Sequence, residues 1–221
     1  ELKSKLQGEV FNVERLSIAL EGGGAAQLSG IWQNGGFKGN MGFHPQDPRR
    51  VIAALAPGIL DQIPQNRLRQ FNLVSGLDYE ADALRLQRVN LNVDETRLRG
   101  ALSIGLQERP RYRAELNIDQ IDVDRYLLPS DSSAAEAQGQ WVAPAAFNDF
   151  DADVRVNISR LKMQQNSYQK ATFDGSLSQG ILTVNDMNIA LGNGAQLQAR
   201  GSVRELTTRP RGDLTLSGSA P

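Results

Sequence analysis

The chain has 221 residues, a formal net charge of −1 and no cysteine. The lack of cysteine excludes disulfides, zinc–thiolate sites and thiol chemistry, and the balanced charge gives no basic footprint for nucleic acid. The length suits one large all-β domain or two small ones. No apolar run approaches the roughly 18 residues that a membrane span needs, and no signal peptide begins the chain. Because the chain starts at Glu1 in "ELKSKL", without a methionine, we expect it to be a piece of a longer protein.

The first clear element is a hairpin that the chain repeats. "LSIALEGGGAAQLSG" (16–30) has alternating apolar residues, a glycine turn and a second alternating step, and it returns as "MNIALGNGAQLQARG" (187–201). A middle copy with a shorter turn is "VNLNVDETRLRG" (89–100). Alternation with a period of two predicts half-buried strands. A polar Arg-Pro-Arg turn and a further alternating strand follow the second and third copies, so the repeated unit is an antiparallel β-meander.

The only helical signal lies in "DPRRVIAALAPGILDQIP", residues 47–64. Asp47 is a suitable N-cap and Pro48 suits the first helical position. Apolar residues at helical spacing follow, until Pro57 and Gly58 interrupt them. We therefore expect one or two short helices in this segment.

A segment rich in Ser, Ala, Gly and Pro, "LPSDSSAAEAQGQWVAPAAFND" (128–149), reads as a long loop. It predicts an N-terminal β-meander region with the short helix over 1–127, a low-complexity linker over 128–146, and a C-terminal β-meander region over 147–221.

The predicted fold class is all-β with minor α. A sheet with one apolar face must cover that face with helices, with a second sheet, or by curling. One short helical segment cannot cover so many strands. The sheet either closes into a sandwich or barrel with a filled interior, or curls into a trough whose aliphatic lining meets something else. The pattern by itself favours the closed core.

Candidate catalytic and metal-binding residues are few. His44 is the single histidine and has no partner acid or nucleophile motif, so a histidine in a loop is favoured over a general base. Asp149, Asp151 and Asp153 could offer oxygen ligands to calcium. They lack the glycine and the closing glutamate of an EF-hand loop, so a solvated strand face is favoured.

Three other features also lack a catalytic or ligand-binding pattern. Asp122 and Asp124 alternate with apolar residues, which predicts that both aspartates lie on the solvent-exposed face of a strand. The glycine clusters at 22–24 and 192–194 join strands and do not open a helix, so they are not phosphate cradles. Trp32 and Trp141 are too isolated to form a stacking platform. We expect no catalytic residue, no metal, no cofactor and no enzymatic activity.

The order of these segments resembles the AsmA family. The similarity rests on "RYRAELNIDQIDVDRYLLP" (111–129), the low-complexity gap, and the stretch from "FDADVRVNISRL" to "LQARGSV" (150–203). "LRLQRVNLNVDETRLRGALSIGL" (84–106) matches the strand pair that usually precedes them. The resemblance covers about 10–218 and depends on alternation, spacing and glycines. The family's N-terminal membrane helix is not in this fragment.

The resemblance implies a protein in the periplasm of a Gram-negative bacterium, anchored in the inner membrane by that helix. AsmA-like proteins are similar to chorein-type bridge proteins, whose repeated β-meanders form an elongated curved sheet with a hydrophobic groove for phospholipids. This implication favours an open groove. The expected function is binding or conducting phospholipid acyl chains for outer-membrane lipid homeostasis, with envelope proteins as further partners.

The aliphatic residues of the alternating strands are the expected lining of that groove: Leu16, Ile18, Leu20, Val89, Leu91, Val93, Val154, Val156, Ile158, Met187, Ile189, Leu191, Leu214 and Leu216. The alternative is a structural or interaction module with a closed β-core and no ligand, which regulates outer-membrane protein assembly. A glycan-binding β-domain is less favoured, because the sequence shows no cluster of aromatic residues.

Overall fold

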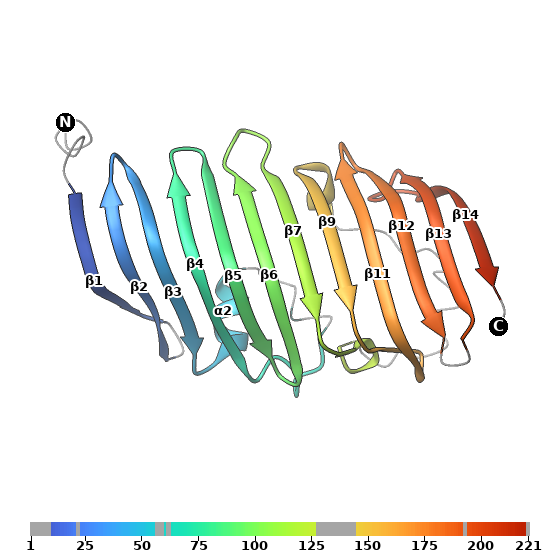
Figure 1. Cartoon of the computed structure of the whole chain (residues 1–221), viewed down its shortest axis with the longest axis horizontal. Coiled ribbons are helices and arrows are strands. Elements are labelled where there is room, and N and C mark those ends of the chain that lie inside the picture. The colour runs from blue at the N-terminus through green and yellow to red at the C-terminus, as the bar shows by residue number, and fades with distance from the viewer. Residues whose placement is uncertain are drawn as a thin grey trace.

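The computed structural model describes residues 10–20, 23–55, 60, 63–126, 145–191 and 194–219. Within these ranges the chain forms one open sheet of 14 strands with little helix (Figure 1). The strands are β1 (Val10–Ala19), β2 (Gly24–Gln33), β3 (Gly36–Pro45), β4 (Phe71–Glu80), β5 (Ala83–Val93), β6 (Thr96–Gly105), β7 (Arg111–Ile118), β8 (Ile121–Asp122), β9 (Asp151–Ile158), β10 (Leu161–Met163), β11 (Asn166–Ser178), β12 (Ile181–Leu191), β13 (Gln196–Arg204) and β14 (Arg211–Ser219).

The strands follow one another in chain order along the sheet, as a meander does. Neighbouring long strands are antiparallel except at one point, where β7 and β9 pair in parallel. This pair joins the regions before and after the low-complexity segment edge to edge in one sheet. The short strands β8 and β10 also pair in parallel and continue β7 and β9 past a break. The predicted all-β meander is therefore confirmed, and the closed sandwich or barrel that the pattern favoured is wrong, because the sheet is open.

The helical prediction is confirmed for α2 (Pro48–Leu55). The Asp47 carboxylate accepts a hydrogen bond from the backbone N–H of Arg50 at 3.2 Å, as an N-cap does. Much of the predicted second half, 56–59 and 61–62, lies outside the described residues. Two 3-10 helices are also present: η2 (Val123–Arg125) precedes the low-complexity segment, and η3 (Ala145–Asn148) lies near its C-terminal end. Residues 127–144 lie outside the described ranges.

The three predicted hairpins are β1–β2, β5–β6 and β12–β13. The first and third have the same turn: Leu20 N–H donates to Gly24 O and Leu191 N–H to Ala195 O, at 3.2 and 2.8 Å. In all three a valine lies opposite a glycine, and the first strand carries one extra residue next to that pair: Val13 and Gly30, Val89 and Gly100, Val184 and Gly201. The extra residue lies on the turn side of the pair in the first and third hairpins, and on the far side in the middle one. Such bulges increase twist and bend a strand.

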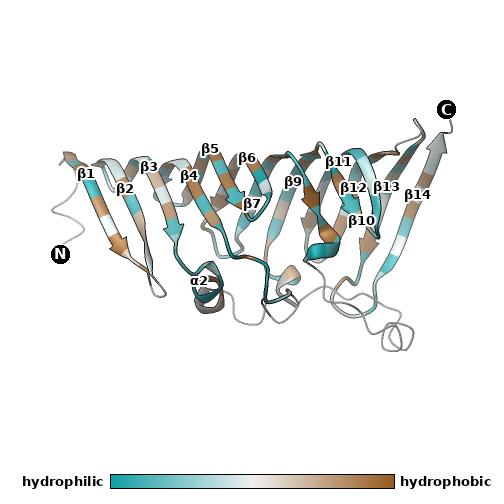
Figure 2. Ribbon diagram, turned by 90° about the horizontal axis from the view of Figure 1, so that it is seen from below, coloured by the Kyte–Doolittle hydropathy of each residue, from teal (hydrophilic) through white to brown (hydrophobic). Residues whose placement is uncertain are grey.

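Figure 2 shows the curved sheet from below, with α2 on one side of it. The chain exposes 14886 Å², whereas a compact protein of 24.2 kDa exposes about 10,000 Å². Among the described residues, no large side chain is completely buried. Both observations fit a sheet that has no second layer over most of its length.

Candidate functional site

The candidate site is the apolar face of the sheet. Residues directly paired across neighbouring strands point to the same face. Followed from β5 to β12, the pairing places Leu91, Val156 and Ile189 on one face, which we call the inner face. The opposite, outer face carries Asn90 and Arg155. The alternation of apolar and polar residues along each strand thus separates two chemically different surfaces.

The structure brings the predicted lining residues together on this inner face. Leu20 directly follows β1, in the turn. The others all lie within strands and share the inner face: Leu16, Ile18, Val89, Leu91, Val93, Val154, Val156, Ile158, Met187, Ile189, Leu191, Leu214 and Leu216. They come from strands at both ends and in the middle of the sheet, so the apolar face is continuous along it.

The inner face also carries aromatic side chains that the sequence analysis missed. Trp32 of β2 lies 6.3 Å, between ring centroids, from Tyr79 of β4. Phe43 and Phe71 make an edge-to-face pair at 5.6 Å. Trp32 therefore has an aromatic neighbour that its place in the sequence did not indicate, whereas Trp141 lies outside the described residues. The partner of Trp32 is distant in the sequence, and only the pairing of β3 with both β2 and β4 brings the rings together.

The inner face is most exposed at the two ends of the sheet. Leu16 and Ile18 in β1 are 47% and 49% exposed, and Leu216 in β14 is 65% exposed. Away from the two edge strands, Val89 of β5 and Val184 of β12 are buried, while most other lining residues are partly buried. Large aliphatic side chains are therefore well exposed at the two ends of this face and partly exposed between them.

One part of the inner face is covered by the chain itself. Leu206, in the connection between β13 and β14, is only 2% exposed and packs with Ala152 and Leu177. Phe147 of η3 and Phe150, just before β9, pack against the same cluster. This small core lies over one end of β9 and β11 and closes the inner face there.

Arg109 holds this cover in place. Its guanidinium donates to the backbone carbonyl oxygens of Asn148 and Phe150, at 2.7 and 3.0 Å, and to the Asp151 carboxylate at 2.9 Å. The hydrogen bond from Arg109 is the main reason that the pKa of Asp151 lies below its ordinary value. One arginine thus ties the segment that carries the two phenylalanines to the loop before β7.

Ion pairs also account for two of the three aspartates that could have offered ligands to calcium. Asp149 is exposed, Asp151 pairs with Arg109, and Asp153 pairs with Arg111 at 2.9 Å. Arginines therefore take the carboxylates that could have offered oxygen to a cation. Among the described residues, no group of three or more His, Cys, Asp or Glu side chains is placed to hold a metal ion.

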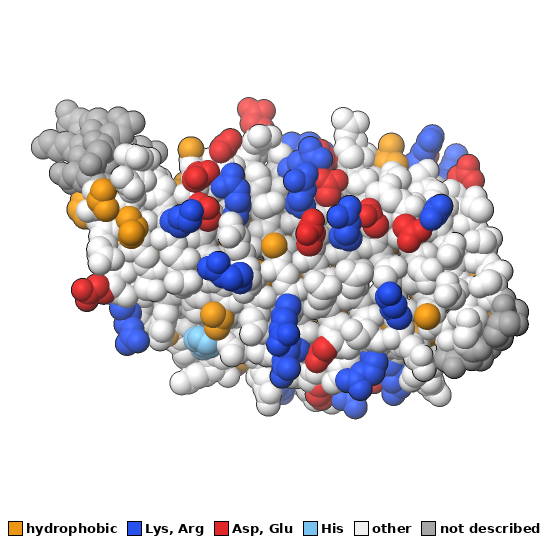
Figure 3. All heavy atoms as spheres, viewed as in Figure 1, with side chains coloured by type: hydrophobic (Ala, Val, Ile, Leu, Met, Phe, Trp, Pro, Cys, Tyr) orange, Lys and Arg blue, Asp and Glu red, His pale blue; other side chains and the backbone are white. Residues whose placement is uncertain are grey.

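The outer face is polar and carries charges of both signs close together (Figure 3). Arg155 pairs with Asp174 at 2.7 Å and Arg200 with Asp186 at 2.8 Å. His44 also lies on this face, near the end of strand β3. The prediction that His44 lies in a loop is therefore wrong.

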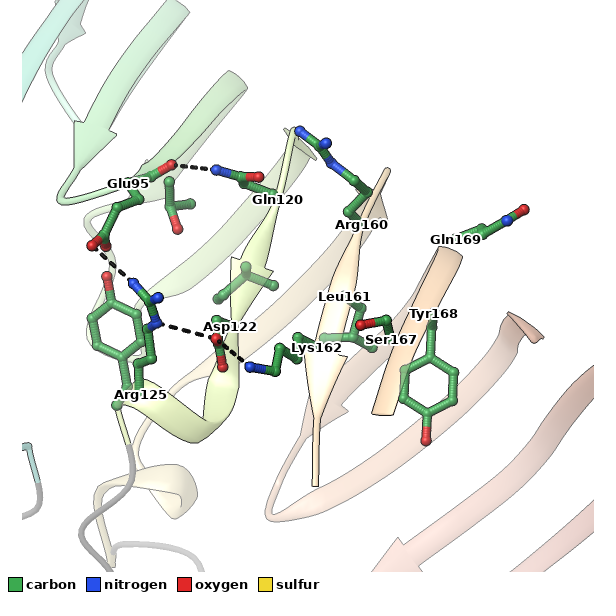
Figure 4. A pocket seen from close by; sticks show the side chains of 13 residues that line it. Glu95, Gln120, Asp122, Arg125, Arg160, Leu161, Lys162, Ser167, Tyr168 and Gln169 are labelled. Carbon is green, nitrogen blue, oxygen red and sulfur yellow. Dashed lines mark hydrogen bonds and ion pairs between the residues drawn. The ribbon is translucent and has the colours of Figure 1, made fainter. Parts of the chain in front are cut away.

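A cavity of about 480 Å³ lies beyond the ends of β7 and β9, between β8, η2 and β10 (Figure 4). Its charged side chains form a chain of ion pairs: Glu95 with Arg125 at 2.9 Å, Arg125 with Asp122 at 3.1 Å, and Asp122 with Lys162 at 3.3 Å. Most of the charge in this cavity is thus neutralised within the protein. We call the place where β8, η2 and β10 meet around it the junction.

The predicted strand face at Asp122 and Asp124 is wrong beyond Asp122. β8 ends there, and Val123–Arg125 form η2. Asp124 accepts hydrogen bonds from the backbone N–H groups of Gln164 and Gln165, at 2.6 and 2.8 Å. It thereby caps the turn between β10 and β11, 40 residues along the chain, which no local pattern could indicate.

Asp94, in the turn between β5 and β6, fixes the same junction from the other side. Its carboxylate accepts hydrogen bonds from Leu68 N–H at 2.8 Å, Arg69 N–H at 2.9 Å and the Tyr126 hydroxyl at 3.1 Å, and also from Gln70 N–H. Burial alone would raise the pKa of Asp94, but these hydrogen bonds outweigh it and lower that pKa. Burial and the nearby Asp94 charge raise the pKa of Tyr126 to about 12.

The fold and its apolar face define a class: an open, single-layered β-meander sheet with one aliphatic and one charged surface. A scan against protein-family models finds no match, and searches of the curated proteins and of the solved structures find none. Within the described ranges, no helix has the length and hydropathy to cross a membrane.

Proposed function

We propose that this chain is the lipid-binding segment of an AsmA-like envelope protein, and that phospholipid acyl chains lie along its inner face. The observation that supports the proposal is the continuous aliphatic face, which is only partly covered and is most exposed at its two ends. Large exposed apolar surfaces on a soluble domain mark interaction sites. A surface of this length suits a long apolar ligand better than a small one.

The binding energy would come from desolvation. Each methylene removed from water contributes about 0.8 kcal/mol, so an acyl chain gains affinity along its whole length. The lining is aliphatic from Leu16 in β1 to Leu216 in β14. Since these aliphatic lining side chains carry no charge to pair with a headgroup, we expect strong binding with little selectivity among phospholipids.

The proposed cellular setting follows from the resemblance to AsmA proteins. The chain would lie in the periplasm of a Gram-negative bacterium, with a separate inner-membrane anchor, and would serve outer-membrane lipid homeostasis as a non-enzymatic protein. The alternative function, a structural module with a closed β-core, required a filled interior. The open sheet does not provide one, so we do not favour it.

The test compares one new carboxylate on each face of the same strand. Leu91 is partly buried on the inner face of β5, and its neighbour Asn90 is exposed on the outer face. Lipid that co-purifies with wild type, Leu91→Asp and Asn90→Asp is extracted and quantified by mass spectrometry. We expect Leu91→Asp to lose lipid at least about tenfold, because an unpaired charge against an acyl chain costs more than about 1.4 kcal/mol.

We expect Asn90→Asp to retain the lipid of the wild type. Ile189→Asp on β12 provides a second inner-face variant, at a site far along the sheet. Thermal unfolding of each variant shows whether the sheet remains folded. A folded wild type that carries no phospholipid and takes up none from vesicles would contradict the proposal.

A further inference from the structure

Four aromatic side chains form a row along one long edge of the inner face. The strand ends at Val10, Gln33, Gly36 and Glu80 lie at the top of the sheet in Figure 1, and we call this edge the upper rim. One residue in from these ends, the register places four rings opposite one another from β1 to β4: Phe11, Trp32, Phe37 and Tyr79. Directly opposed residues point to the same face, so these four residues form what we call the aromatic row.

The aromatic row lies in an open part of the inner face. Phe11 is 41% exposed, and the other three rings are partly buried. The cover around Leu206 lies further along the same rim, over Ala152 of β9 and Leu177 of β11. Helix α2 follows the opposite end of β3, at the edge that we call the lower rim (Figure 1). Neither cover therefore lies over the aromatic row.

The aromatic row differs in chemistry from the rest of the inner face of β1–β4. Trp32 and Tyr79 each carry an apolar ring with a polar atom at its tip. Within the described part of the chain, neither the Trp32 indole N–H nor the Tyr79 hydroxyl has a hydrogen-bond partner. Toward the lower rim, the large inner-face side chains of these strands are apolar, such as Ile18, Leu28 and Phe43. The face is thus apolar across most of its width, with polar tips along the upper rim.

This arrangement matches the structure of a phospholipid. Tryptophan and tyrosine favour the boundary between hydrocarbon and water, where the ring contacts methylene groups and the polar tip reaches the headgroup level. The width of the face also fits. Trp32 and Ala26, both on the inner face of β2, lie about 20 Å apart along the strand. The hydrocarbon of one leaflet is about 15 Å thick, half of the bilayer core, so an acyl chain that begins at the aromatic row fits along β2.

We propose that the aromatic row fixes the orientation of the bound lipid. The glycerol ester region of a phospholipid rests on the aromatic row, the headgroup projects past the upper rim, and the acyl chains run along the strands toward the lower rim. This inference rests on the proposed function and adds a direction to it. The charges beside the row have both signs, as in the ion pair of Arg85 with Glu80 at 2.9 Å. The aromatic row therefore positions the ester region that phospholipids share, without selecting a headgroup charge.

Fluorescence quenching by spin-labelled lipid tests this orientation. The chain has two tryptophans, and Trp141→Phe leaves Trp32 as the reporter. This variant is loaded from vesicles of phosphatidylcholine that carries a nitroxide either on the headgroup or near the methyl end of one acyl chain, and is then separated from the vesicles. Because a nitroxide quenches only at close approach, we expect the headgroup label to reduce the Trp32 fluorescence more than the acyl-chain label does.

The matched control moves the reporter to the lower rim. Ile18→Trp, combined with Trp32→Tyr and Trp141→Phe, places the single tryptophan on β1, at a position that is 49% exposed and so can hold a larger ring. Tyrosine at position 32 keeps a ring with a polar tip in the aromatic row. We expect the order of quenching to reverse at this reporter, and thermal unfolding checks that the variant folds.

A second pair of variants tests whether the aromatic row causes the orientation. In the chain with the Ile18→Trp reporter, Trp32→Leu/Tyr79→Leu keeps apolar side chains in the row but removes its polar tips. Both labels should then quench the reporter equally, because the lipid can lie in either direction. Phe43→Leu/Phe71→Leu removes two rings at the lower rim instead, and the difference between the labels should remain.

The outcomes separate this inference from the proposed function. Equal quenching of Trp32 by both labels, or stronger quenching by the acyl-chain label, would overturn the orientation while lipid binding stands. An unchanged order of quenching in Trp32→Leu/Tyr79→Leu would show that the aromatic row does not set the orientation. If neither label quenches either reporter in the folded protein, the proposed function fails, and this inference fails with it.

Discussion

Gly30 of β2 and Gly39 of β3 lie directly opposite each other on the inner face. A Cβ on Gly30 would fall against the backbone of Lys38 and Gly39, and a Cβ on Gly39 would fall against Ser29 and Gly30. The two strands therefore approach each other where no side chain fits between them. Gly100 and Gly201 have the same lack of space against their own neighbouring strands, which places the repeated glycines where the backbone is most crowded.

We expect Gly100→Ala to destabilise the protein by about 2–3 kcal/mol. Its Cβ would overlap the carbonyl oxygen of Glu115 on β7, and that oxygen belongs to backbone that cannot move freely. Gly105 on the same strand is the control, because its Cβ would make only ordinary contacts, at 3.7 Å or more. Gly105→Ala should change the free energy of unfolding by less than about 0.5 kcal/mol. Urea denaturation measures both, and equal effects would contradict this account of the glycine.

Arg109→Ala should loosen the cover over the small core. The guanidinium satisfies the carbonyls of Asn148 and Phe150 and pairs with Asp151, and we expect its loss to cost about 1–3 kcal/mol. Arg113→Ala is a matched control, because that arginine is exposed and its ion pair with Asp153 is longer, at 3.6 Å. An exposed pair of this kind contributes at most about 1 kcal/mol. Hydrogen exchange of residues 145–150 should rise in Arg109→Ala alone, and unchanged protection would refute the role of Arg109.

The Asp94 junction predicts a pH dependence of stability. Since the pKa of Asp94 is lowered in the folded state, its contribution is present above the unfolded value of about 3.9. That contribution disappears as the pH falls through the lower, folded value. Asp94→Asn should therefore be less stable than the wild type at pH 7, by about 1–3 kcal/mol. The difference should shrink below about pH 4. Urea unfolding across this pH range is the measurement, and a constant difference would contradict the prediction.

Two aliphatic residues, one in the cover over the inner face and one on the open part of that face, should respond differently to truncation. Leu206 is 2% exposed beneath its neighbours, and Ile18 is 49% exposed at the end of the sheet. Leu206→Ala leaves a cavity and should cost about 2–5 kcal/mol. Ile18→Ala should cost less than about 1 kcal/mol, because water already reaches that side chain. If thermal unfolding shows similar losses, the inner face is covered where we describe it as open.

Much of the architecture could be predicted because it depends on neighbouring residues. Period-two alternation assigned Leu16 and Ile18 to the same face as Ile189, and the register confirms this assignment. The glycine turns and the Asp47 cap are likewise local, since their hydrogen bonds join residues a few positions apart. What could not be predicted involves residues far apart, such as Trp32 with Tyr79 and Asp124 with Gln164.

The sequence by itself determined the strands, their turns, the start of the helix, and the division of the sheet into an apolar and a polar face. Each of these follows from backbone preferences and side-chain alternation over a few residues. Only the tertiary structure decided that the sheet stays open, that β7 and β9 join in parallel, and that Leu206 and Phe147 close one part of the inner face. The physical reason is that an apolar strand face looks the same in the sequence whether a second layer, a loop or an external ligand covers it. What covers that face depends on contacts between segments far apart in the sequence, and local backbone preferences do not predict such contacts.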